Sequence, residues 1–416
     1  MQFNNVTCPH CGLLCDDLSV EIDQGTVKLT APRDINCSKA FADATLSSDL
    51  PSPKIGAEKV SLDEAITKAS EILAHASQPL INGLIADVQA CRAAVALTEK
   101  VGGVIDHANG RNIRPNVAVM QRLGKVKTTL AEARNRADNI IIFGSHVLDR
   151  FPRLIDRILK PKQSLGSDQT INKSITVLDI AGTETSVQIG QHESIKYHQL
   201  KLDSLDSIMQ TFQNVIHTDS ENVDGEISQI LHGLKDQIYQ KNYTVLIWST
   251  SLLDSDAAEQ SIQSITLGIK DLMKDVRCVG MPLSGSKGEI TASQVVTWQS
   301  GVPLPVAFMS GVPQHDPVLY DGLGMLEKRE ADAMLWLSTY RSTDTPPACN
   351  IPTIVIGHAN MQCADADVFI PVGIPGIDTR GLACRTDSVA TLPLLKIRDI
   401  ALPDASDVIA KITQKI

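Results

Sequence analysis

Short runs of β-branched residues that end in glycine alternate with amphipathic segments along this chain, and that alternation restricts the fold more than any other feature. "PLINGLIADV" (79–88) and "ADNIIIFGS" (137–145) have the pattern of buried strands, whereas "VQACRAAVALTEKVG" (88–102) has that of an amphipathic helix. Strand, helix, strand is the order that produces a parallel sheet. We therefore predict an α/β fold with doubly wound, mostly parallel sheets.

The same order returns after a polar stretch at 217–225, with "YTVLIWS" as a strand, a helix from about Asp256 to Met273, and "DVRCVGM" as the next strand. "AMLWLS", "IPTIVIG" and "ADVFIPV" continue this second set of strands. The Ser- and Pro-rich segment 47–61 has the composition of a linker. We predict a small N-terminal module (1–50), a first α/β domain (51–216) and a second α/β domain (217–416).

Ligands of doubly wound sheets bind at the carboxyl ends of the strands. The predicted ligand loops are those that follow Gly144, Ile180, Ser249, Met281, Ser338 and Gly357. The sequence has no GxGxxG turn at a helix start and no GxxxxGK[ST] motif, so a simple dinucleotide or ATP site has no support.

Charge and composition exclude several partners for this chain of 416 residues. A net charge of -10 argues against nucleic acid, because binding to the phosphate backbone depends on clustered Lys and Arg. No apolar run approaches the roughly 20 residues of a membrane span, and no secretory signal is visible, so we expect a cytoplasmic protein. Thiols stay reduced there, and the nine cysteines are best interpreted as metal ligands plus core thiols.

Four of the cysteines form a motif. Cys8, Cys11 and Cys15 lie within "VTCPHCGLLCDDLSV", and Cys37 follows 22 positions after Cys15. Four thiolates on a tight loop with one return suit a cubane iron-sulfur cluster. Zinc sites usually present two Cys-x2-Cys-type pairs, and Cys15 and Cys37 are too far apart in sequence to form one. Zinc and an empty relic site remain the alternatives to the cluster.

The remaining cysteines and the histidines give weaker signals. Cys91 lies on the apolar side of a predicted helix, where an inert core thiol is the expected role. His107, His146 and His358 each follow a predicted strand and are pocket candidates, although loop histidines are more often solvated than catalytic.

An N-terminal four-cysteine loop followed by repeated α/β units resembles the molybdenum and tungsten pterin oxidoreductases of the formate dehydrogenase and DMSO reductase type. Within that group the chain is similar to the B subunit of formylmethanofuran dehydrogenase. Five landmarks carry the resemblance in order between residues 8 and 389: "CPHCGLLCDD", "ARNRADNIIIFGS", "VLDIAGTETS", "ASQVVTWQSGVP" and "GIPGIDTRGLACRTDSV".

The resemblance implies a 4Fe-4S cluster held by the four cysteines of the N-terminal loop and a bis-pterin metal centre between the α/β domains. It places Lys39 between cluster and pterin, and Thr183, Glu184 and Thr185 at the dinucleotide pterin. A helix N-cap is the simpler interpretation of this last segment. It also implies a chain without the C-terminal barrel of the larger relatives.

The chain departs from the family where the metal ligand is expected. Relatives that oxidise a formyl group place a Cys or selenocysteine shortly before a proline that matches Pro115, and here the matching residue is Asn112. An amide is a weak ligand for a soft, high-valent metal, so the molybdenum or tungsten bis-pterin is expected to be absent. Arg111 and Arg114 flank this position and are expected to face solvent or an interface, with anion binding as the alternative.

This departure is typical of a family variant in methylotrophic bacteria, the formyltransferase/hydrolase complex. The resemblance implies a non-redox B subunit, a scaffold for an amidohydrolase A subunit, a C subunit and a formyltransferase D subunit. Together they would convert formyl-tetrahydromethanopterin to formate through a methanofuran-type carrier. The alternatives are a catalytic B subunit of a molybdenum or tungsten formylmethanofuran dehydrogenase and a free-standing iron-sulfur protein.

Two further expectations follow. A module of about 45 residues is too small to be stable on its own core, so the cluster is expected to have a structural role. The D subunit is expected to cover the face that holds Arg111, Arg114 and the polar segment 161–173, and the chain alone is expected to self-associate through exposed apolar surface.

Overall fold

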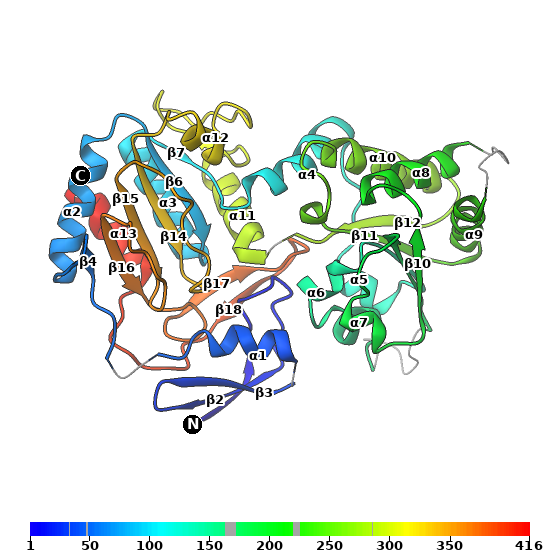
Figure 1. Ribbon diagram of the computed structural model, residues 1–416, viewed down its shortest axis with the longest axis horizontal. Helices are drawn as coiled ribbons and strands as arrows, with labels where there is room; N and C mark the ends of the chain where they lie inside the picture. Colours follow the sequence, from blue (N-terminus) through cyan, green and yellow to red (C-terminus); the bar gives the residue numbers. More distant parts are fainter. Residues whose placement is uncertain (33, 47–48, 163–171, 219–224, 285) are drawn as a thin grey trace. The chain divides into compact units, whose positions relative to one another are not determined.

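The chain forms two compact units, one of which is discontinuous in sequence. The computed structural model describes residues 1–32, 34–46, 49–162, 172–218, 225–284 and 286–416 (Figure 1). Unit 1 comprises Met1–Gly110 and Gly285–Ile416, and unit 2 comprises Arg111–Ser284. The boundaries predicted at 1–50, 51–216 and 217–416 do not coincide with these units. Unit 2 is an insertion between the two segments of unit 1.

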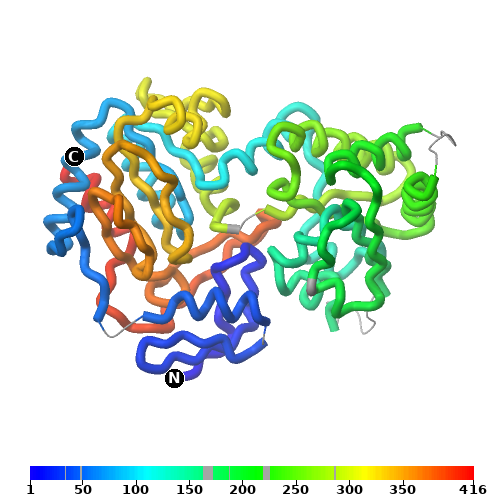
Figure 2. Tube along the Cα trace, viewed as in Figure 1, coloured from blue at the N-terminus to red at the C-terminus, as the bar shows by residue number. Residues whose placement is uncertain are grey.

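Unit 1 is built on an eight-stranded sheet with the order β13-β7-β6-β14-β15-β16-β4-β5. Its strands are β4 (Lys54–Ile55), β5 (Glu58–Lys59), β6 (Pro79–Ile85), β7 (Val104–Ile105), β13 (Val306–Ala307), β14 (Ala333–Ser338), β15 (Thr353–His358) and β16 (Val368–Val372). The strands from β7 to β16 in this order are parallel, and the short edge strands are antiparallel. Figures 1 and 2 show blue β6 beside orange β14.

The predicted grouping of strands into two sheets is wrong, although each predicted strand is present. The sequence pattern groups β14, β15 and β16 in a second sheet with "YTVLIWS", but these strands pair with β6 from the first half of the chain. Each is buried along its whole length, so its apolar run fits a centre position in either sheet. Hydrophobic pattern identifies such strands but does not specify their neighbours.

Helices cover the sheet of unit 1 and share one core with it. They are α2 (Leu62–His75), α3 (Val88–Val101), α11 (Glu289–Ser300), α12 (Gly322–Glu327) and α13 (Ala405–Lys415). The core joins residues of α2, α3, α11 and α13 to the central strands, and Cys91 lies in it with no exposed surface. The prediction of a core thiol at Cys91 is confirmed. A hairpin of β17 (Gly381–Cys384) and β18 (Thr391–Leu394) completes the unit.

The N-terminal segment of unit 1 forms a small antiparallel sheet with one helix. Strands β1 (Gln2–Val6), β2 (Leu18–Asp23) and β3 (Thr26–Ala31) pair in sequence order, and α1 (Ile35–Ala42) packs against β3. Phe41 of α1 has no exposed surface and fills the space beside the cysteine loop.

Unit 2 contains a five-stranded, fully parallel sheet with the order β10-β9-β8-β11-β12. Its strands are β8 (Asn139–Phe143), β9 (Ser174–Ile180), β10 (Ile195–Leu200), β11 (Thr244–Trp248) and β12 (Cys278–Pro282). Its helices are α5 (Leu130–Asn135), α6 (His146–Arg150), α7 (Val187–Gly190), α8 (Leu205–His217), α9 (Glu226–Gln240) and α10 (Ala258–Leu272), with a π-helix at Ile155–Leu159. A mixed α/β fold with parallel sheets is confirmed.

The segment "GRNIRPN", which includes the expected metal-ligand position Asn112, is helical. It opens α4 (Gly110–Leu123), which contains Pro115 and begins at the boundary between the units. Among the described residues, no helix is both long and apolar enough to span a bilayer.

Candidate metal centre

The loop between β1 and β2 and the first turn of α1 bring the four predicted ligands to one place. Cys8, Cys11 and Cys15 lie on the loop, and Cys37 lies in α1. The loop is closed by the Cys8 N–H, which donates to the Cys15 carbonyl oxygen at 2.8 Å. Cys8 and Cys15 are each 4% exposed and Cys37 is 8% exposed, so the thiols face inward.

The four thiols are close enough to influence one another electrostatically. Burial raises the pKa of the Cys8 thiol well above its ordinary value, and the other three cysteines raise it further. Burial and then Cys15 raise the pKa of Cys11 to about 12, and burial and then Cys11 raise that of Cys37. Thiols that oppose one another's ionisation, three buried and one half-buried, require a cation if they are to become thiolates together.

Backbone N–H groups of the loop already point at two of the sulfur atoms. Hydrogen bonds from the backbone of His10 to Cys8 and from that of Leu13 to Cys11 lower the pKa values of these thiols, against the larger effect of burial. Such donors stabilise metal-bound thiolates. The residue types of the loop and these donors are therefore those that would hold a thiolate-bound metal group.

Cys37 occupies the third position of α1. Asp34 is the N-cap, and its carboxylate accepts hydrogen bonds from the N–H groups of Asn36 and Cys37, each at 2.9 Å. The partial positive charge of a helix N-terminus favours a thiolate there. In the described part of the chain, no group of three or more His, Cys, Asp or Glu side chains is arranged to hold a metal ion. Both the presence of a metal group at the four cysteines and its identity therefore stay predictions.

His10, between Cys8 and Cys11, is a polar residue that the sequence pattern does not single out. Its ring lies edge-on to Phe41 with centroids 5.1 Å apart, and only 3% of the residue is exposed. Burial, followed by Arg341, lowers its pKa to about 3, so the imidazole is neutral. Both ring nitrogens lack a hydrogen-bond partner among the described residues. Its position between two ligand cysteines is the only signal that the sequence offers.

Buried polar atoms also gather where β14 and β15 end. Ser338 Oγ, Tyr340 Oη and His358 Nε2 are buried and have no hydrogen-bond partner in the part of the chain that the structure describes. Asp344 is 7% exposed, and its Oδ1 atom lies 2.9 Å from Lys287 Nζ. Two of the predicted ligand loops, after Ser338 and Gly357, begin here.

The three histidines that follow predicted strands differ in exposure. His358 has no exposed surface, and His107 is 2% exposed with Nε2 at 3.0 Å from the Lys287 carbonyl oxygen. Of the three histidines, only His146 has an exposed side chain, and its Nδ1 atom lies 3.0 Å from the Asp149 carboxylate. Solvation, the more common state of loop histidines, therefore applies to one of the three.

The residues predicted at the pterin lie in two different units. Lys39 is an exposed residue of α1 in unit 1. Glu184 and Thr185 of unit 2 are exposed, and Thr183 donates to Asp179 at 3.2 Å. The N-cap of α7 is Ser186, so the N-cap interpretation of Thr183–Thr185 is wrong by one residue.

Asn112 lies in the first turn of α4. It is half-buried, as is Arg114, whereas Arg111 is exposed. Residues 163–171 of the predicted contact segment lie outside the described residues. The expected roles of these residues stay predictions.

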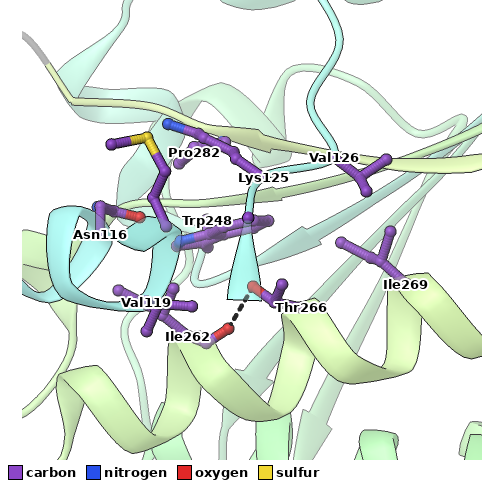
Figure 3. Close-up of a pocket in the computed structure, with 11 residues that line it drawn as sticks. Asn116, Val119, Lys125, Val126, Trp248, Ile262, Thr266, Ile269 and Pro282 are labelled. Atoms are coloured by element: carbon purple, nitrogen blue, oxygen red, sulfur yellow. Dashed lines mark hydrogen bonds between the residues drawn. The ribbon is translucent and has the colours of Figure 1, made fainter. Parts of the chain in front are cut away.

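A small cavity lies at the carboxyl ends of β11 and β12 in unit 2 (Figure 3). Trp248 and Pro282, the last residues of these strands, line it with Asn116, Lys125 and Thr266. Its volume of about 20 Å³ is sufficient for about one water molecule. The indole of Trp248 lies across Gly280, where an added Cβ would be 2.7 Å from the ring.

The fold and the site define a parallel α/β protein with a candidate four-thiolate centre. Comparisons with known proteins make this more specific. The chain is 26% identical over 409 residues to the B subunit of tungsten-containing formylmethanofuran dehydrogenase 2 of Methanocaldococcus jannaschii, with 95% of this chain and 93% of the relative covered. It is 26% identical over 323 residues to the B subunit of the formyltransferase/hydrolase complex Fhc of Methylorubrum extorquens, with 77% and 84% covered. No family model matches the chain.

Solved structures agree with these relatives. A chain of the formyltransferase/hydrolase complex FhcABCD from Methylorubrum extorquens, solved with methylofuran, superposes with a TM-score of 0.72 at 23% identity, covering 87% of this chain and 98% of that one. Acetylene hydratase from Pelobacter acetylenicus shares the fold more distantly, with a TM-score of 0.56 at 11% identity, covering 99% of this chain and 69% of that one. Homologues of the chain therefore include the B subunits of both formyl-processing complexes.

Proposed function

We propose that the chain is the non-redox B subunit of a formyltransferase/hydrolase complex in one-carbon metabolism. In this proposal the complex converts formyl-tetrahydromethanopterin to formate through a methanofuran-type carrier. The observation that carries it is Asn112, the residue at the position where the resemblance expects a metal-binding thiolate. The likeness to the B subunit of Fhc and to a chain of FhcABCD supports it.

The partners in this proposal are an amidohydrolase A subunit, a C subunit and a formyltransferase D subunit. The structural relative is part of a complex named FhcABCD, which supports a multisubunit assembly. The chain contributes a scaffold of mostly parallel sheets. A cytoplasmic location is part of the proposal, and its support is that none of the nine cysteines, all of which the structure describes, is joined in a disulfide.

The four cysteines hold a 4Fe-4S cluster in this proposal. Burial of the thiols, their mutual opposition to ionisation and the N–H groups directed at Cys8 and Cys11 support it. A bound cluster supplies ligation free energy to a small module. The chain's own residues determine the shape of the site: Asp34 begins the helix that carries Cys37, and the Cys8–Cys15 hydrogen bond closes the loop. Lys39 and the segment Thr183–Thr185 are then vestiges of a pterin site.

The alternative function is the catalytic B subunit of a molybdenum or tungsten formylmethanofuran dehydrogenase. The alignment to the tungsten enzyme of Methanocaldococcus jannaschii, which covers 95% of this chain, favours it. Under this alternative the metal centre uses a ligand other than a thiolate at position 112.

Metal and pterin analysis of the purified complex separates the two functions. The non-redox proposal expects iron and sulfide without molybdenum, tungsten or pterin, together with release of formate from formyl-tetrahydromethanopterin without an electron acceptor. Stoichiometric molybdenum or tungsten with pterin would refute the non-redox proposal. The Asn112→Cys variant is a useful control, because supplying the thiolate alone is not expected to create acceptor-dependent oxidation in a chain that binds no pterin.

A further inference from the structure

The end of α1 is held by hydrogen-bond donors from several distant loops of unit 1. Asn360, after β15, donates from Nδ2 to the carbonyl oxygens of Asp43 at 3.0 Å and Thr45 at 2.8 Å. Ser342, after β14, donates its N–H and its hydroxyl to the Asp43 carboxylate at 2.8 and 2.5 Å. The acceptors are all on the N-terminal segment, and the donors are all on the loops of the large sheet.

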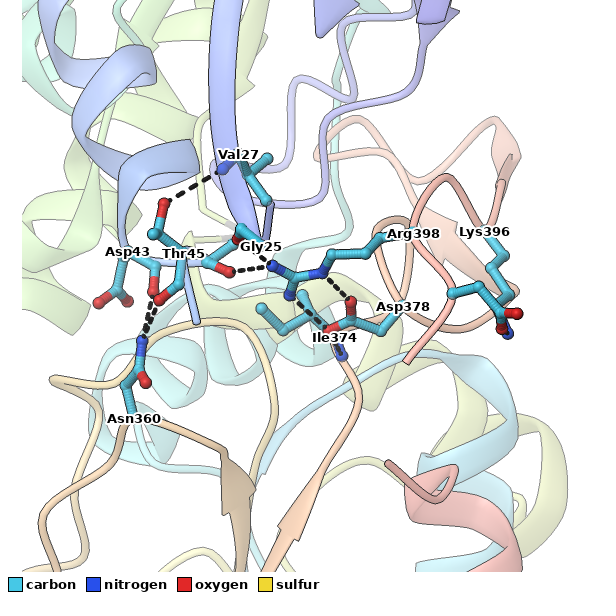
Figure 4. Close-up of polar contacts among 11 residues, drawn as sticks. Gly25, Val27, Asp43, Thr45, Asn360, Ile374, Asp378, Lys396 and Arg398 are labelled. Carbon is cyan, nitrogen blue, oxygen red and sulfur yellow. Dashed lines mark hydrogen bonds and ion pairs between the residues drawn. The ribbon is translucent and has the colours of Figure 1, made fainter. Parts of the chain in front are cut away.

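Arg398 is the central donor of this contact (Figure 4). Its Nη1 atom donates to the carbonyl oxygens of Gly25 at 2.8 Å and Ala44 at 2.7 Å. Nε and Nη2 bind the Asp378 carboxylate at 2.7 and 3.1 Å. The two side chains are 4% and 0% exposed. A buried guanidinium with a bidentate counter-ion and two carbonyl acceptors is fixed in position, because moving it leaves a charge and two carbonyls unpaired.

The cysteine loop is anchored to the same body from its other side. The Thr386 N–H, in the β17–β18 connection, donates to the Gly12 carbonyl oxygen at 2.8 Å. Arg341 Nη2 donates to the His10 carbonyl oxygen at 3.3 Å. The loop that carries three thiols and the helix that carries the fourth are therefore tied separately to one rigid sheet unit.

We propose that Arg398 is a positioning residue for the four-thiol centre, with Asp378 as its counter-ion and Asn360 as a second donor. The inference rests on the proposed assignment of Cys8, Cys11, Cys15 and Cys37 as cluster ligands. Asn360 and Arg398 bind the carbonyl oxygens of residues 43–45, the C-cap of α1 and the two residues that follow it, and Cys37 lies in the first turn of the helix. Their bonds therefore fix where α1 places the Cys37 sulfur relative to the three sulfurs of the loop.

The charge pattern along α1 supports this role. A helix carries partial negative charge at its C-terminus and partial positive charge at its N-terminus. Asn360 binds the carbonyl oxygen of the C-cap residue Asp43 at the negative end, and Arg398 binds that of Ala44, the next residue, so both side chains fix the end of the helix opposite to Cys37. Lys396, two residues before Arg398, offers a matched control. It forms an ion pair with Asp399, but the side chains of this pair are 40% and 94% exposed.

The test uses the full chain, purified anaerobically with its partner subunits, in three variants. Arg398→Lys keeps the charge but cannot bind Asp378 and two carbonyls in the same geometry. Asn360→Ala removes two hydrogen bonds without leaving a buried charge, so it remains informative if the first variant does not fold. Lys396→Gln is the control. The measurements are iron and sulfide per chain, the electron paramagnetic resonance spectrum after reduction, the rate of iron removal by a chelator, and the melting temperature.

Both test variants are expected to lose iron to the chelator at least fivefold faster than the wild type at a temperature where each is fully folded. Their spectra should have shifted g-values, whereas Lys396→Gln should match the wild type in every measurement. Folded variants with wild-type iron loss and spectra would overturn the inference and leave the cluster assignment intact. The inference would also be overturned if the variants lost iron faster only in step with a lower melting temperature and kept unchanged g-values. A purely structural role predicts that result. Wild-type protein without iron would overturn the cluster assignment and the inference together.

Discussion

Acidification should destabilise unit 1 through His107, and the structure allows the size of the effect to be worked out. The Asn109 N–H donates to His107 Nδ1 at 2.9 Å, and Nε2 lies 3.0 Å from the Lys287 carbonyl oxygen. Nδ1 is thus an acceptor and Nε2 carries the proton. A second proton would face the Asn109 N–H, and the site is buried, so the imidazole stays neutral in the folded state.

The pKa of His107 is lowered from 6.5 to about 4, chiefly by burial; the hydrogen bond to the Lys287 carbonyl opposes this shift, and the Lys287 ammonium adds to it. Two acids lie nearby. The Asp106 carboxylate accepts a hydrogen bond from the backbone N–H of His107, and the Glu289 carboxylate accepts one from the side-chain amide of Asn109. Between pH 6.5 and 4 the unfolded chain binds more protons than the folded one, so stability is complete above pH 6.5 and falls as the pH is lowered. The loss is about 2 kcal/mol at pH 5 and about 3 kcal/mol at pH 4.

The variant His107→Gln isolates this contribution. A glutamine amide can still donate to the Lys287 carbonyl but does not titrate, so the variant should lose less stability than the wild type between pH 7.5 and 5, by about 2 kcal/mol. Urea unfolding at several pH values measures it, with exposed His75→Gln as the control. His10 and His358, whose pKa values burial also lowers, act equally in all three proteins. Parallel pH profiles for His107→Gln and the wild type would refute the reasoning.

Three further predictions concern packing, the cysteine loop and assembly. Gly280→Ala should lower the free energy of unfolding by about 1–3 kcal/mol, because the new Cβ meets the Trp248 ring at 2.7 Å. Gly233→Ala, at an exposed position of α9, should raise the free energy of unfolding by about 0.5–1 kcal/mol. Urea unfolding measures both variants, and equal effects would contradict the packing argument. Cys11→Ser should reduce bound iron and expose residues 1–46 to limited proteolysis, and normal assembly with full stability would show that the centre has no structural role. The chain expressed without partner subunits should self-associate in light scattering and should copurify with a formyltransferase when coexpressed; a monomer that captures no partner would contradict the scaffold proposal.

Sequence alone locates the strands well and pairs them poorly. The runs at 139–143, 244–248 and 353–358 are recognisable because buried parallel strands are continuous apolar segments. Their order is not accessible, because β6 and β14 pair across an insertion and no local pattern marks that contact. The helix at 110–123 escapes prediction because Pro115 argues against a helix interior.

The candidate centre is likewise only partly predictable from the sequence. Spacing identifies the thiols, since metal ligands on one loop are close in sequence. Arg398 and Asn360 cannot be identified from sequence, because they act on residues 25 and 43–45 from more than 300 positions away, and Asp378 matters only through Arg398. Buried Arg and Asp are uncommon, but a sequence does not reveal which charged residues are buried.

The insertion of unit 2 into unit 1 has a consequence for synthesis on the ribosome. β6 ends at Ile85, and its neighbour β14 begins at Ala333, so β6 emerges long before the strand that covers its edge. At about 5–20 residues per second, that interval is roughly 10–50 seconds. Unit 2 is continuous and can fold during this time, while the first part of unit 1 waits with an apolar strand and the cysteine loop exposed. The nascent chain is therefore most vulnerable to aggregation and to oxidation of its thiols during this interval, and it depends on chaperones then more than at any later stage.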